Sequence, residues 1–595
     1  MTWIQNKLKI EEWQHMLKDV DLSLYGIYNS TEQELVYRFL ESRGISKPEE
    51  VENIFNPSVE DEHNIMLANG AKAWLATLFS IKDTNIVIVG DYDADGVMAS
   101  TVAYRGLKLL GIGHKLSQYV PIREDGYGLS IKSVDKLLSE YPDTETLITV
   151  DNGVVAYDGV MHAKELGLTV LVTDHHLGKD EDTVADAVVD INRPGDDYPF
   201  KGLSGTAVIW KLLQSYARTV ANPEVNRQID NLVDYVGIST ITDIMPVLDE
   251  NRYYVKQALN SMNKRLRTQW QVLFTALKKH AEDNGKHAYI DNINEEFIGF
   301  TLGPMLNAVG RVTGSPEIAY DFFKTTDLVQ MMDDAKSLIR INELRKEEVS
   351  KFAEMASDLY DGKQPESIVV ALPVKIGYAG LIASNLNERF DRPVIVLSGQ
   401  SGIIHGSARS PMWFNIVEAM QTMADEGLIG QFGGHAGAAG LEMDASNVIS
   451  VQNRLDELVG EELQAIATSG KAVEKTKPDL SLHLETNFAA RETIATDFGL
   501  AGNDDLVEVA DIFDKMRPFG HAFSEPLVKV ENVDFESAFR MGAEKQHAKA
   551  KLGDLAILAW NLDKNHENVE SVLGTLGINE FRGNVTPQII VKKFI

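Results

Sequence analysis

Four short segments rich in aspartate and histidine are the part of this sequence best suited to chemistry. They are Asp91-Tyr-Asp93-Ala-Asp95-Gly, Asp151-Asn-Gly, Asp174-His175-His176 and Thr242-Asp243. Carboxylate oxygens and imidazole nitrogens suit divalent ions such as Mn²⁺ or Mg²⁺ better than thiolate-loving ions. Two such ions about 4 Å apart can activate a water and hold both oxygens of an in-line displacement. The four segments therefore predict a two-metal phosphoesterase.

The first segment has two other interpretations when it is taken alone. Its D-x-D-x-D-G pattern also begins a calcium-binding loop, but Val102 stands where that loop needs a bidentate glutamate. An acidic turn in solvent is the second alternative. The other segments favour a metal site, because Asp151 can bridge two ions. One histidine of the pair can ligate a metal while the other contacts phosphate or relays a proton.

Short apolar runs precede at least three of these segments and predict the strands that position them. The runs cover residues 86–89, 147–150, 169–172 and 187–191, with helical patterns between them, the first ending at Gly111. Strands that alternate with helices predict a mostly parallel sheet, whose sites lie beyond the carboxyl ends of the strands. Asp243 follows a further apolar run, 236–241, and we expect it to join the same site.

Composition limits the class of protein. The length of 595 residues predicts several domains. A net charge of −31, from 57 Lys and Arg against 88 Asp and Glu, argues against nucleic-acid binding over the whole surface but permits a local basic channel. The absence of cysteine excludes disulfides, zinc–thiolate sites and thiol catalysis. Without a long apolar run or the apolar core of a signal peptide, we expect a cytoplasmic protein with no membrane contact.

The pattern of elements along the chain predicts an α/β multidomain protein. We expect an N-terminal helical segment over 1–70, a parallel-sheet domain over 71–250, a helical connector over 251–362, a smaller α/β domain over 363–470 and a β-rich domain over 471–595. In the connector, Leu338, Arg345, Phe352 and Leu359 recur every seven positions. A long helix between two globular parts and an ordinary surface helix explain that spacing equally well.

A basic strand is predicted in the β-rich domain. Lys545, His547, Lys549 and Lys551 alternate, so all four would share one face of a strand. Gly553-Asp554 then suits a two-residue hairpin turn. A platform that binds nucleic acid is one interpretation. A solvated lysine face on an edge strand is the other.

The four metal segments resemble those of the DHH phosphoesterase superfamily. The Asp-His-His motif that gives the superfamily its name corresponds here to Asp174-His175-His176. Gly433-Gly434-His435 is similar to the signature of the DHH-associated domain. Residues 303–311 resemble the P-x-x-N-A-x-G-R element of RecJ-type exonucleases, and residues 406–410 resemble their G-S-x-R-S element. Residues 517–526 resemble the stretch that opens their OB-fold. The resemblance covers residues ~70 to 570 in family order, and it implies a parallel-sheet DHH domain, a helical connector, a DHH-associated domain and a C-terminal OB-fold.

The resemblance implies a 5′→3′ exonuclease that hydrolyses single-stranded DNA to mononucleotides in repair, recombination or replication. Its cofactors would be two divalent ions, with Mn²⁺ preferred or Mg²⁺. We expect a monomer, with a single-strand-binding protein or a helicase as candidate partners. Two alternatives stay open: a phosphodiesterase for short oligonucleotides or cyclic dinucleotides, and a non-catalytic replication scaffold. The long connector and the OB-like part speak against the first alternative, and the intact set of metal residues speaks against the second.

Roles follow from the resemblance, motif by motif. The implied metal ligands are Asp93, Asp95, Asp151, His175 and Asp243. The implied catalytic or supporting groups are His176, for phosphate contact or proton transfer, with Asp91 and Asp174. The implied substrate contacts are Arg409, Ser410, Gly434, His435, Asn307, Arg311, Lys545, Lys549 and Lys551; the guanidinium of an arginine suits a phosphate because it binds in a bidentate way.

The chain departs from the family pattern at two places. Some superfamily members have a histidine where this sequence has Val89, which leaves one metal site short of an imidazole. Many members also carry a Trp-His pair near residues 375–380, where this chain reads Lys-Ile-Gly-Tyr-Ala-Gly. The first departure is expected to weaken one metal site or alter its metal preference.

Overall fold

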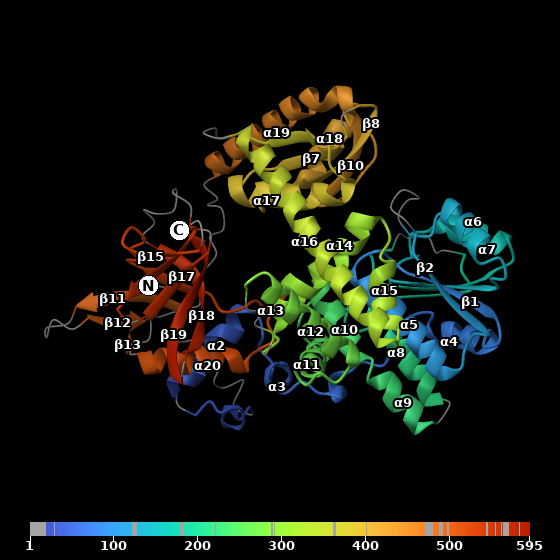
Figure 1. Cartoon of the computed structure of the whole chain (residues 1–595), viewed down its shortest axis with the longest axis horizontal. Coiled ribbons are helices and arrows are strands. Elements are labelled where there is room, and N and C mark those ends of the chain that lie inside the picture. The colour runs from blue at the N-terminus through green and yellow to red at the C-terminus, as the bar shows by residue number, and fades with distance from the viewer. Residues whose placement is uncertain are drawn as a thin grey trace.

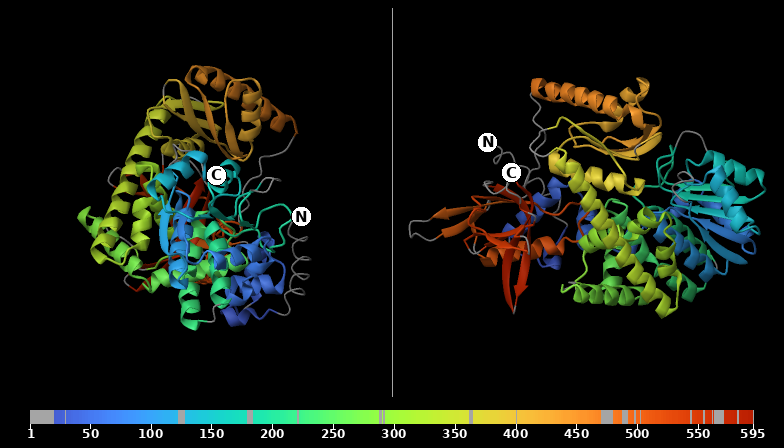
Figure 2. Two further views of the ribbon diagram at one scale, coloured as in Figure 1. Left: turned by 90° about the vertical axis from the view of Figure 1, so that its right-hand side faces the viewer. Right: turned by 45° about the horizontal axis from the view of Figure 1, so that its top comes forward.

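The computed structural model places three regions around a helical centre, as Figure 1 and the turned views of Figure 2 show. A parallel-sheet region lies at the right of Figure 1, a second sheet region at the top and a β-rich region at the left. The structure describes residues 20–594 except 29, 122–127, 179–183, 220–221, 287–289, 291, 361–364, 400, 470–479, 487–491, 497–498, 502, 543–544, 554, 561, 563–570 and 582.

The first sheet is parallel throughout, as its alternating pattern predicts. Its strands run in the order β2-β1-β3-β4-β5. Their bounds are β1 Asn85–Val89, β2 Lys115–Tyr119, β3 Thr146–Val150, β4 Thr169–Asp174 and β5 Ala187–Asp190. Strands β2 and β3 flank β1, so the strand order reverses there, and ligands of open α/β sheets bind beyond the carboxyl ends of the strands at such a point.

Helices cover both faces of this sheet. One face packs against α4 (Ala71–Ser80), α5 (Ala94–Leu110) and α8 (Gly205–Thr219) in the main core. The other face packs against α6 (Ile131–Glu140) and α7 (Tyr157–Glu165), which bury Val134, Leu137 and Val160. Helix α5 ends where Gly111 takes a left-handed conformation at φ 67°, as its sequence predicts.

A helical region follows and includes the apolar run before Asp243. That run lies in helix α10 (Val233–Thr242), so Asp243 stands at the end of a helix and not at the end of a strand. The other helices here are α9 (Pro223–Asp230), α11 (Glu250–Asn263), α12 (Thr268–Asp283), α13 (Glu295–Phe297), α14 (Gly303–Thr313) and α15 (Glu317–Lys324).

One long helix joins the helical region to the second sheet, as Figure 1 shows. Helix α16 (Leu328–Asp358) has 31 residues. Its first half buries Leu338 in the main core, and its second half buries Ala353 and Ala356 against the second sheet region. The seven-residue spacing therefore marks a true connecting helix.

The second sheet is mixed and carries the glycine-rich segment on its edge. Its strand order is β6-β7-β8-β10-β9. The strands are β6 Ile368–Leu372, β7 Val394–Ser398, β8 Ile403–Arg409, β9 Phe432–His435 and β10 Ala438–Asp444. Helices α17 (Ile376–Phe390), α18 (Ile416–Asp425) and α19 (Val448–Ser469) complete the region.

The β-rich region forms one nine-stranded sheet in the order β13-β12-β11-β14-β18-β19-β17-β16-β15. Its strands are β11 Leu480–Thr486, β12 Glu492–Thr496, β13 Gly499–Ala501, β14 Val528–Glu531, β15 Phe539–Met541, β16 His547–Leu552, β17 Leu555–Ala559, β18 Ser571–Phe581 and β19 Asn584–Phe594, with helix α20 (Asn503–Lys515). The predicted multidomain α/β fold, with its parallel sheet, helical region and C-terminal β sheet, is confirmed.

The N-terminal helices belong to the core of the C-terminal region. Helices α2 (Ser30–Ser42) and α3 (Pro48–Phe55) bury Val36 and Val51 together with Phe513 and Phe523. Buried Arg252 joins these parts to α11, because its guanidinium donates to the carbonyl oxygens of Ile54, Met516 and Pro518 at 2.8, 2.6 and 2.8 Å. Arg252 therefore ties both the N-terminal helices and the C-terminal region to the helical region.

Among the residues that the structure describes, no helix combines the length and the apolar character needed to span a membrane.

Candidate metal centre

The acidic turn after β1 is shaped by the start of helix α5. Asp93 caps this helix, and its carboxylate accepts a hydrogen bond from the Gly96 amide at 3.0 Å. Gly96 has no room for a side chain, because a Cβ there would lie 2.4 Å from the Asp91 carbonyl oxygen. The turn therefore places three carboxylates within one helical turn at the carboxyl end of β1.

Four hydrogen bonds hold the carboxylate of buried Asp95. Its Oδ2 accepts from the Gly205 amide at 2.8 Å. Its Oδ1 accepts from the Thr206 amide at 3.0 Å and from the hydroxyls of Thr206 and Ser239, each at 2.5 Å. Sequence reasoning missed these three residues, which come from the starts and interiors of two helices. The only available signal was the Ser-Gly-Thr run that opens α8.

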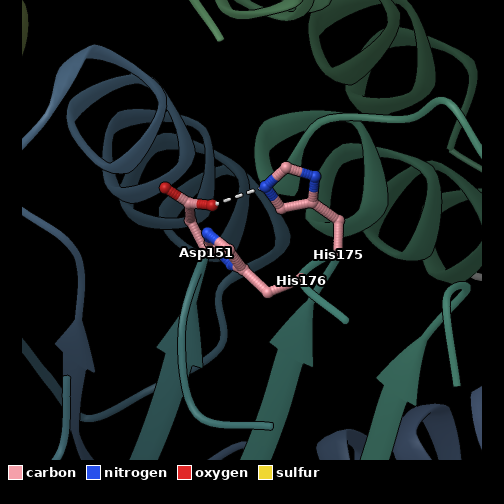
Figure 3. Close-up of side chains that lie close together, drawn as sticks. All are labelled: Asp151, His175 and His176. Carbon is pink, nitrogen blue, oxygen red and sulfur yellow. Dashed lines mark ion pairs between the residues drawn. The ribbon is translucent and has the colours of Figure 1, made fainter. Parts of the chain in front are cut away.

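His175 presents one ring nitrogen to the carboxylates. Its Nδ1–H donates to the Leu203 carbonyl oxygen at 3.0 Å, which fixes the tautomer and leaves Nε2 as the acceptor. Nε2 lies 3.1 Å from Asp151 Oδ1, 3.4 Å from Asp243 Oδ2 and 3.7 Å from Asp95 Oδ2. Figure 3 shows the His175 ring directed at Asp151. A neutral imidazole nitrogen facing carboxylates suits a shared cation.

Several buried atoms in this centre have no hydrogen-bond partner. They are Asp151 Oδ1, His175 Nε2 and Asp243 Oδ2. Burial and the nearby carboxylates, Asp95 first, raise the pKa of Asp151 and raise that of Asp243 to about 9. A divalent cation would satisfy the orphaned atoms and remove the repulsion between the carboxylates. The residues therefore fit a metal site.

The donor atoms form adjacent groups that share ligands. Asp95, His175 and Asp243 form one group, and Asp91, Asp93 and Asp151 form another, with donor atoms in each group within 4.8 Å of one another. Asp151 also groups with both histidines. Asp151 and His175 each belong to two groups, so this set of donors would fit two neighbouring ions.

Val89 adds no ligand to the second group. It is fully buried in β1 and packs in the core between the sheet and helices α6 and α7. The group of Asp91, Asp93 and Asp151 thus contains carboxylates alone, as the sequence departure predicts. Such an all-oxygen group favours hard ions such as Mg²⁺ and Mn²⁺.

Asp174 holds the second histidine. Its carboxylate accepts from His176 Nδ1 at 2.8 Å and from the amides of His175, His176 and Val154. Burial lowers the pKa of His176, but the hydrogen bond to Asp174 outweighs this effect and raises the pKa to about 9. The side chain of His176 is 43% exposed, so it faces the site from its open side. An oriented imidazole there can contact a phosphate or carry a proton.

Helix α14 connects the acidic turn to the second sheet region. The Asn307 side-chain oxygen accepts from the Ala94 amide at 2.7 Å. Arg311 donates to the Gly377 carbonyl oxygen at 2.9 Å. Tyr320, which sequence reasoning missed, donates from α15 to the Asp91 carbonyl oxygen at 2.8 Å. Asn307 and Arg311 thus make positioning contacts, and any role toward substrate stays a prediction.

The second sheet gathers the other predicted substrate residues. Arg409 pairs across strands with Ala438, which also pairs with His435, and the Ser410 amide donates to the Gly437 carbonyl oxygen at 2.9 Å. Gly434 has φ 152°, and a Cβ there would lie 2.3 Å from the Ala438 carbonyl oxygen. The glycine therefore permits the close pairing of β9 with β10 that places His435 opposite Ala438.

The basic strand has three of its four predicted members. His547, Lys549 and Lys551 alternate with buried residues along β16, so they share its open face. Lys545 precedes the strand with φ 56°, so its predicted place on that face is wrong. Strand pairing joins Leu552 to Leu555 across the predicted turn; Asp554 lies outside the described residues.

Two exposed aromatic residues, which sequence reasoning missed, lie near this basic face. Phe539 pairs with Lys549 and is 70% exposed. Trp560 is 53% exposed, and its ring centroid lies 5.0 Å from that of His547.

One test of the Asp95 cradle is the Thr206→Val change. It removes one donor to Asp95 and keeps the side-chain shape, so the affinity for Mn²⁺ should fall by about 10- to 100-fold, the range of outer-shell partners. Calorimetric titration with Mn²⁺ would measure the change. The exposed Thr275→Val variant of α12 is the matched control and should bind Mn²⁺ like the unchanged protein. Equal affinities of the two variants would contradict this role for Thr206.

Fold and site together define the class of this protein: an α/β protein with a carboxylate and imidazole centre, fit for divalent ions, at the carboxyl edge of a parallel sheet. Comparison with family models agrees. The DHH family, N-terminal domain, matches residues 85–238, the DHHA1 domain matches 369–461 and the RecJ OB domain matches 496–593. The chain therefore carries a DHH domain, a DHHA1 domain and a RecJ OB domain, in that order.

Known relatives are similar over most of the chain. The single-stranded-DNA-specific exonuclease RecJ of Bacillus subtilis is 31% identical over 85% of this chain, and this chain spans 61% of its length. The protein of the same name from Escherichia coli is 28% identical over 94% of this chain and 95% of its own length. The crystal structure of RecJ in complex with Mn²⁺ from Thermus thermophilus has a TM-score of 0.75, with 22% identity, over 98% of this chain and 78% of that one.

Proposed function

We propose that this chain is a 5′→3′ exonuclease that hydrolyses single-stranded DNA to 5′-mononucleotides with two divalent ions, Mn²⁺ or Mg²⁺. The observation that supports it most is the set of adjacent ligand groups at the carboxyl edge of the parallel sheet, in which Asp151 and His175 each belong to two groups. The names of the relatives support the substrate, since they are single-stranded-DNA-specific exonucleases. The place of such an activity would be DNA repair, recombination or replication.

Each part of the centre has a role in this proposal. Bound ions would supply an activated water and stabilise the charge of the reacting phosphate. Asp93, Asp95, Asp151, His175 and Asp243 would hold them. Asp91 would support the acidic turn. Asp174 would keep the His176 ring oriented, so that His176 contacts the phosphate or moves a proton.

The two outer regions would hold the strand. Arg409, Ser410 and His435 lie at the same end of the second sheet, at the ends of β8 and β9 to either side of β10. The guanidinium of Arg409 suits a phosphate. The open face of β16 combines His547, Lys549 and Lys551 with the exposed rings of Phe539 and Trp560. Cations beside aromatic rings are what a non-specific single-strand platform requires, because every base has a face that can stack.

We also propose domain bounds and an oligomeric state for the chain. The DHH domain would cover 71–250, the helical connector 251–362, the DHH-associated domain 363–470 and the OB-fold 471–595. Segment 1–70 would be a separate N-terminal segment, whose helices α2 and α3 pack on the C-terminal region. We propose a monomer that works beside a single-strand-binding protein or a helicase. Size-exclusion chromatography with light scattering would test the monomer.

Substrate length separates this function from its alternative. A small-substrate phosphodiesterase would cleave a dinucleotide as fast as a long single strand, because it needs no extended binding surface. We expect a much higher kcat/KM on the long strand, measured in matched reactions with Mn²⁺. Equal values for the two substrates would move the chain to the small-substrate class.

The role of the basic face of β16 in binding single-stranded DNA can be tested by removing its lysines. Replacing Lys549 and Lys551 with alanine should weaken the binding of single-stranded DNA and lower the slope of log affinity against log salt by about 0.7 per lost phosphate contact. Fluorescence anisotropy across a salt series measures both. The exposed Lys72→Ala variant on α4 is the control and should keep the slope. An unchanged slope in the double variant would favour a lysine face that is merely solvated.

A further inference from the structure

Ile244 has a backbone conformation that its side chain disfavours. Its φ is 58°, in the left-handed region that a β-branched residue rarely adopts. It directly follows the residue that ends helix α10, a position where glycine or asparagine is usual. A glycine at this position would have no such strain. The chain therefore carries isoleucine where the fold itself favours another residue.

Packing does not explain the isoleucine. Its side chain is 69% exposed, so little apolar surface is buried in return for the strain. The backbone alone is held, since the amides of Asp243, Ile244 and Met245 donate to carbonyl oxygens of α10 at 2.9, 3.3 and 2.9 Å. These bonds would persist with any side chain. The exposed isoleucine thus contributes nothing evident to stability.

The position of Ile244 is next to the metal centre. The preceding residue, Asp243, places its Oδ2 3.4 Å from His175 Nε2. A second large apolar residue, Leu177, directly follows His176 in the sequence and is 83% exposed. Residues with strained backbone conformations cluster at functional sites. An exposed apolar side chain at such a place can contact a bound ligand. A polar metal centre with exposed aliphatic neighbours suits a substrate that is anionic at one end and apolar beside it.

We propose that Ile244 packs against the sugar and base of the nucleotide whose phosphate lies at the metal centre, and that Leu177 provides a second apolar contact. This inference rests on the proposed function and assigns the residue that holds the terminal nucleotide in place. An aliphatic side chain against a base face does not distinguish one base from another. The contact therefore suits an enzyme that removes successive nucleotides without regard to sequence.

Three substitutions at position 244 separate a substrate contact from a structural role. Ile244→Gly and Ile244→Asn both accept the left-handed backbone and remove the aliphatic contact. Both should raise the midpoint of thermal unfolding, because the strain is relieved. Both should also raise KM for single-stranded DNA about five- to tenfold, the low end for a base-packing contact. Ile244→Leu keeps an aliphatic side chain and should keep the KM of the unchanged protein.

A measurement of metal affinity completes the test. Calorimetric titration with Mn²⁺ should give the same affinity for all three variants, since Asp243 keeps its backbone bonds. KM values for Ile244→Gly and Ile244→Asn equal to that of the unchanged protein would overturn the inference, as would a loss of Mn²⁺ affinity that accounts for the change. Failure of the unchanged protein to digest single-stranded DNA would instead refute the proposed function.

Discussion

Replacing Asp151 with asparagine should lower the rate of single-stranded DNA digestion by more than about 100-fold, because outer-shell partners of a metal alone are worth about 10- to 100-fold. Asp151 lies in two of the ligand groups and 3.1 Å from His175, so both proposed ions would depend on it. A neutral amide keeps the size of the side chain but cannot supply the anionic bridge. Initial rates with saturating Mn²⁺ would measure the loss.

Folding can be checked separately from catalysis in the same variant. Burial and the neighbouring carboxylates raise the pKa of Asp151, so an asparagine should leave the metal-free protein at least as stable as before. Mn²⁺ should raise the midpoint of thermal unfolding of the unchanged protein and have much less effect on Asp151→Asn. The exposed Asp143→Asn variant is the control and should keep both activity and Mn²⁺ response. Digestion by Asp151→Asn at the rate of this control would contradict the bridging role.

Replacing His176 with alanine should lower kcat by about 100- to 10,000-fold, the range for a positioned proton-transfer group. The imidazole is oriented by Asp174 and half-exposed at the site, as expected for a group that meets the substrate. Affinity for Mn²⁺ should change little, since the other ligands remain. Single-turnover kinetics and calorimetric titration together separate the two effects.

Asp174→Asn provides the companion measurement for His176. Asparagine keeps the shape of the side chain but weakens the charge-assisted bond that orients the ring. Its kcat should fall less than that of His176→Ala, because the imidazole is still present. A loss of Mn²⁺ affinity in His176→Ala that matches the loss of rate would instead make His176 a metal ligand.

Sequence pattern could predict the strands and the acidic segments that follow them. Parallel sheets place such segments at one edge, so Asp91, Asp151 and His175 could be gathered without coordinates. A helix could also be predicted from the seven-residue spacing in α16, but the spacing could not show that this helix connects two packed regions. Local periodicity reports which face of an element is apolar but not what covers that face.

The rest of the site depends on contacts between distant parts of the chain. Gly205, Thr206 and Ser239 reach Asp95 across more than a hundred residues, and a glycine amide carries no motif. Ile244 has no signal in sequence, because its strain is a property of the backbone angle. The packing of the N-terminal helices on the C-terminal β region could not be predicted either. The apolar face of a helix has the same sequence pattern whichever partner covers it.

A digestion time course with single-stranded DNA labelled at either the 5′ or the 3′ end tests the central claim most directly. With Mn²⁺, the unchanged protein should release labelled mononucleotide at once from the 5′-labelled strand and only late from the 3′-labelled strand, and a chelator should stop both. The Asp151→Asn protein should release neither. Early release from the 3′ end, release without divalent ions, or no digestion with any metal would contradict a two-metal 5′→3′ exonuclease.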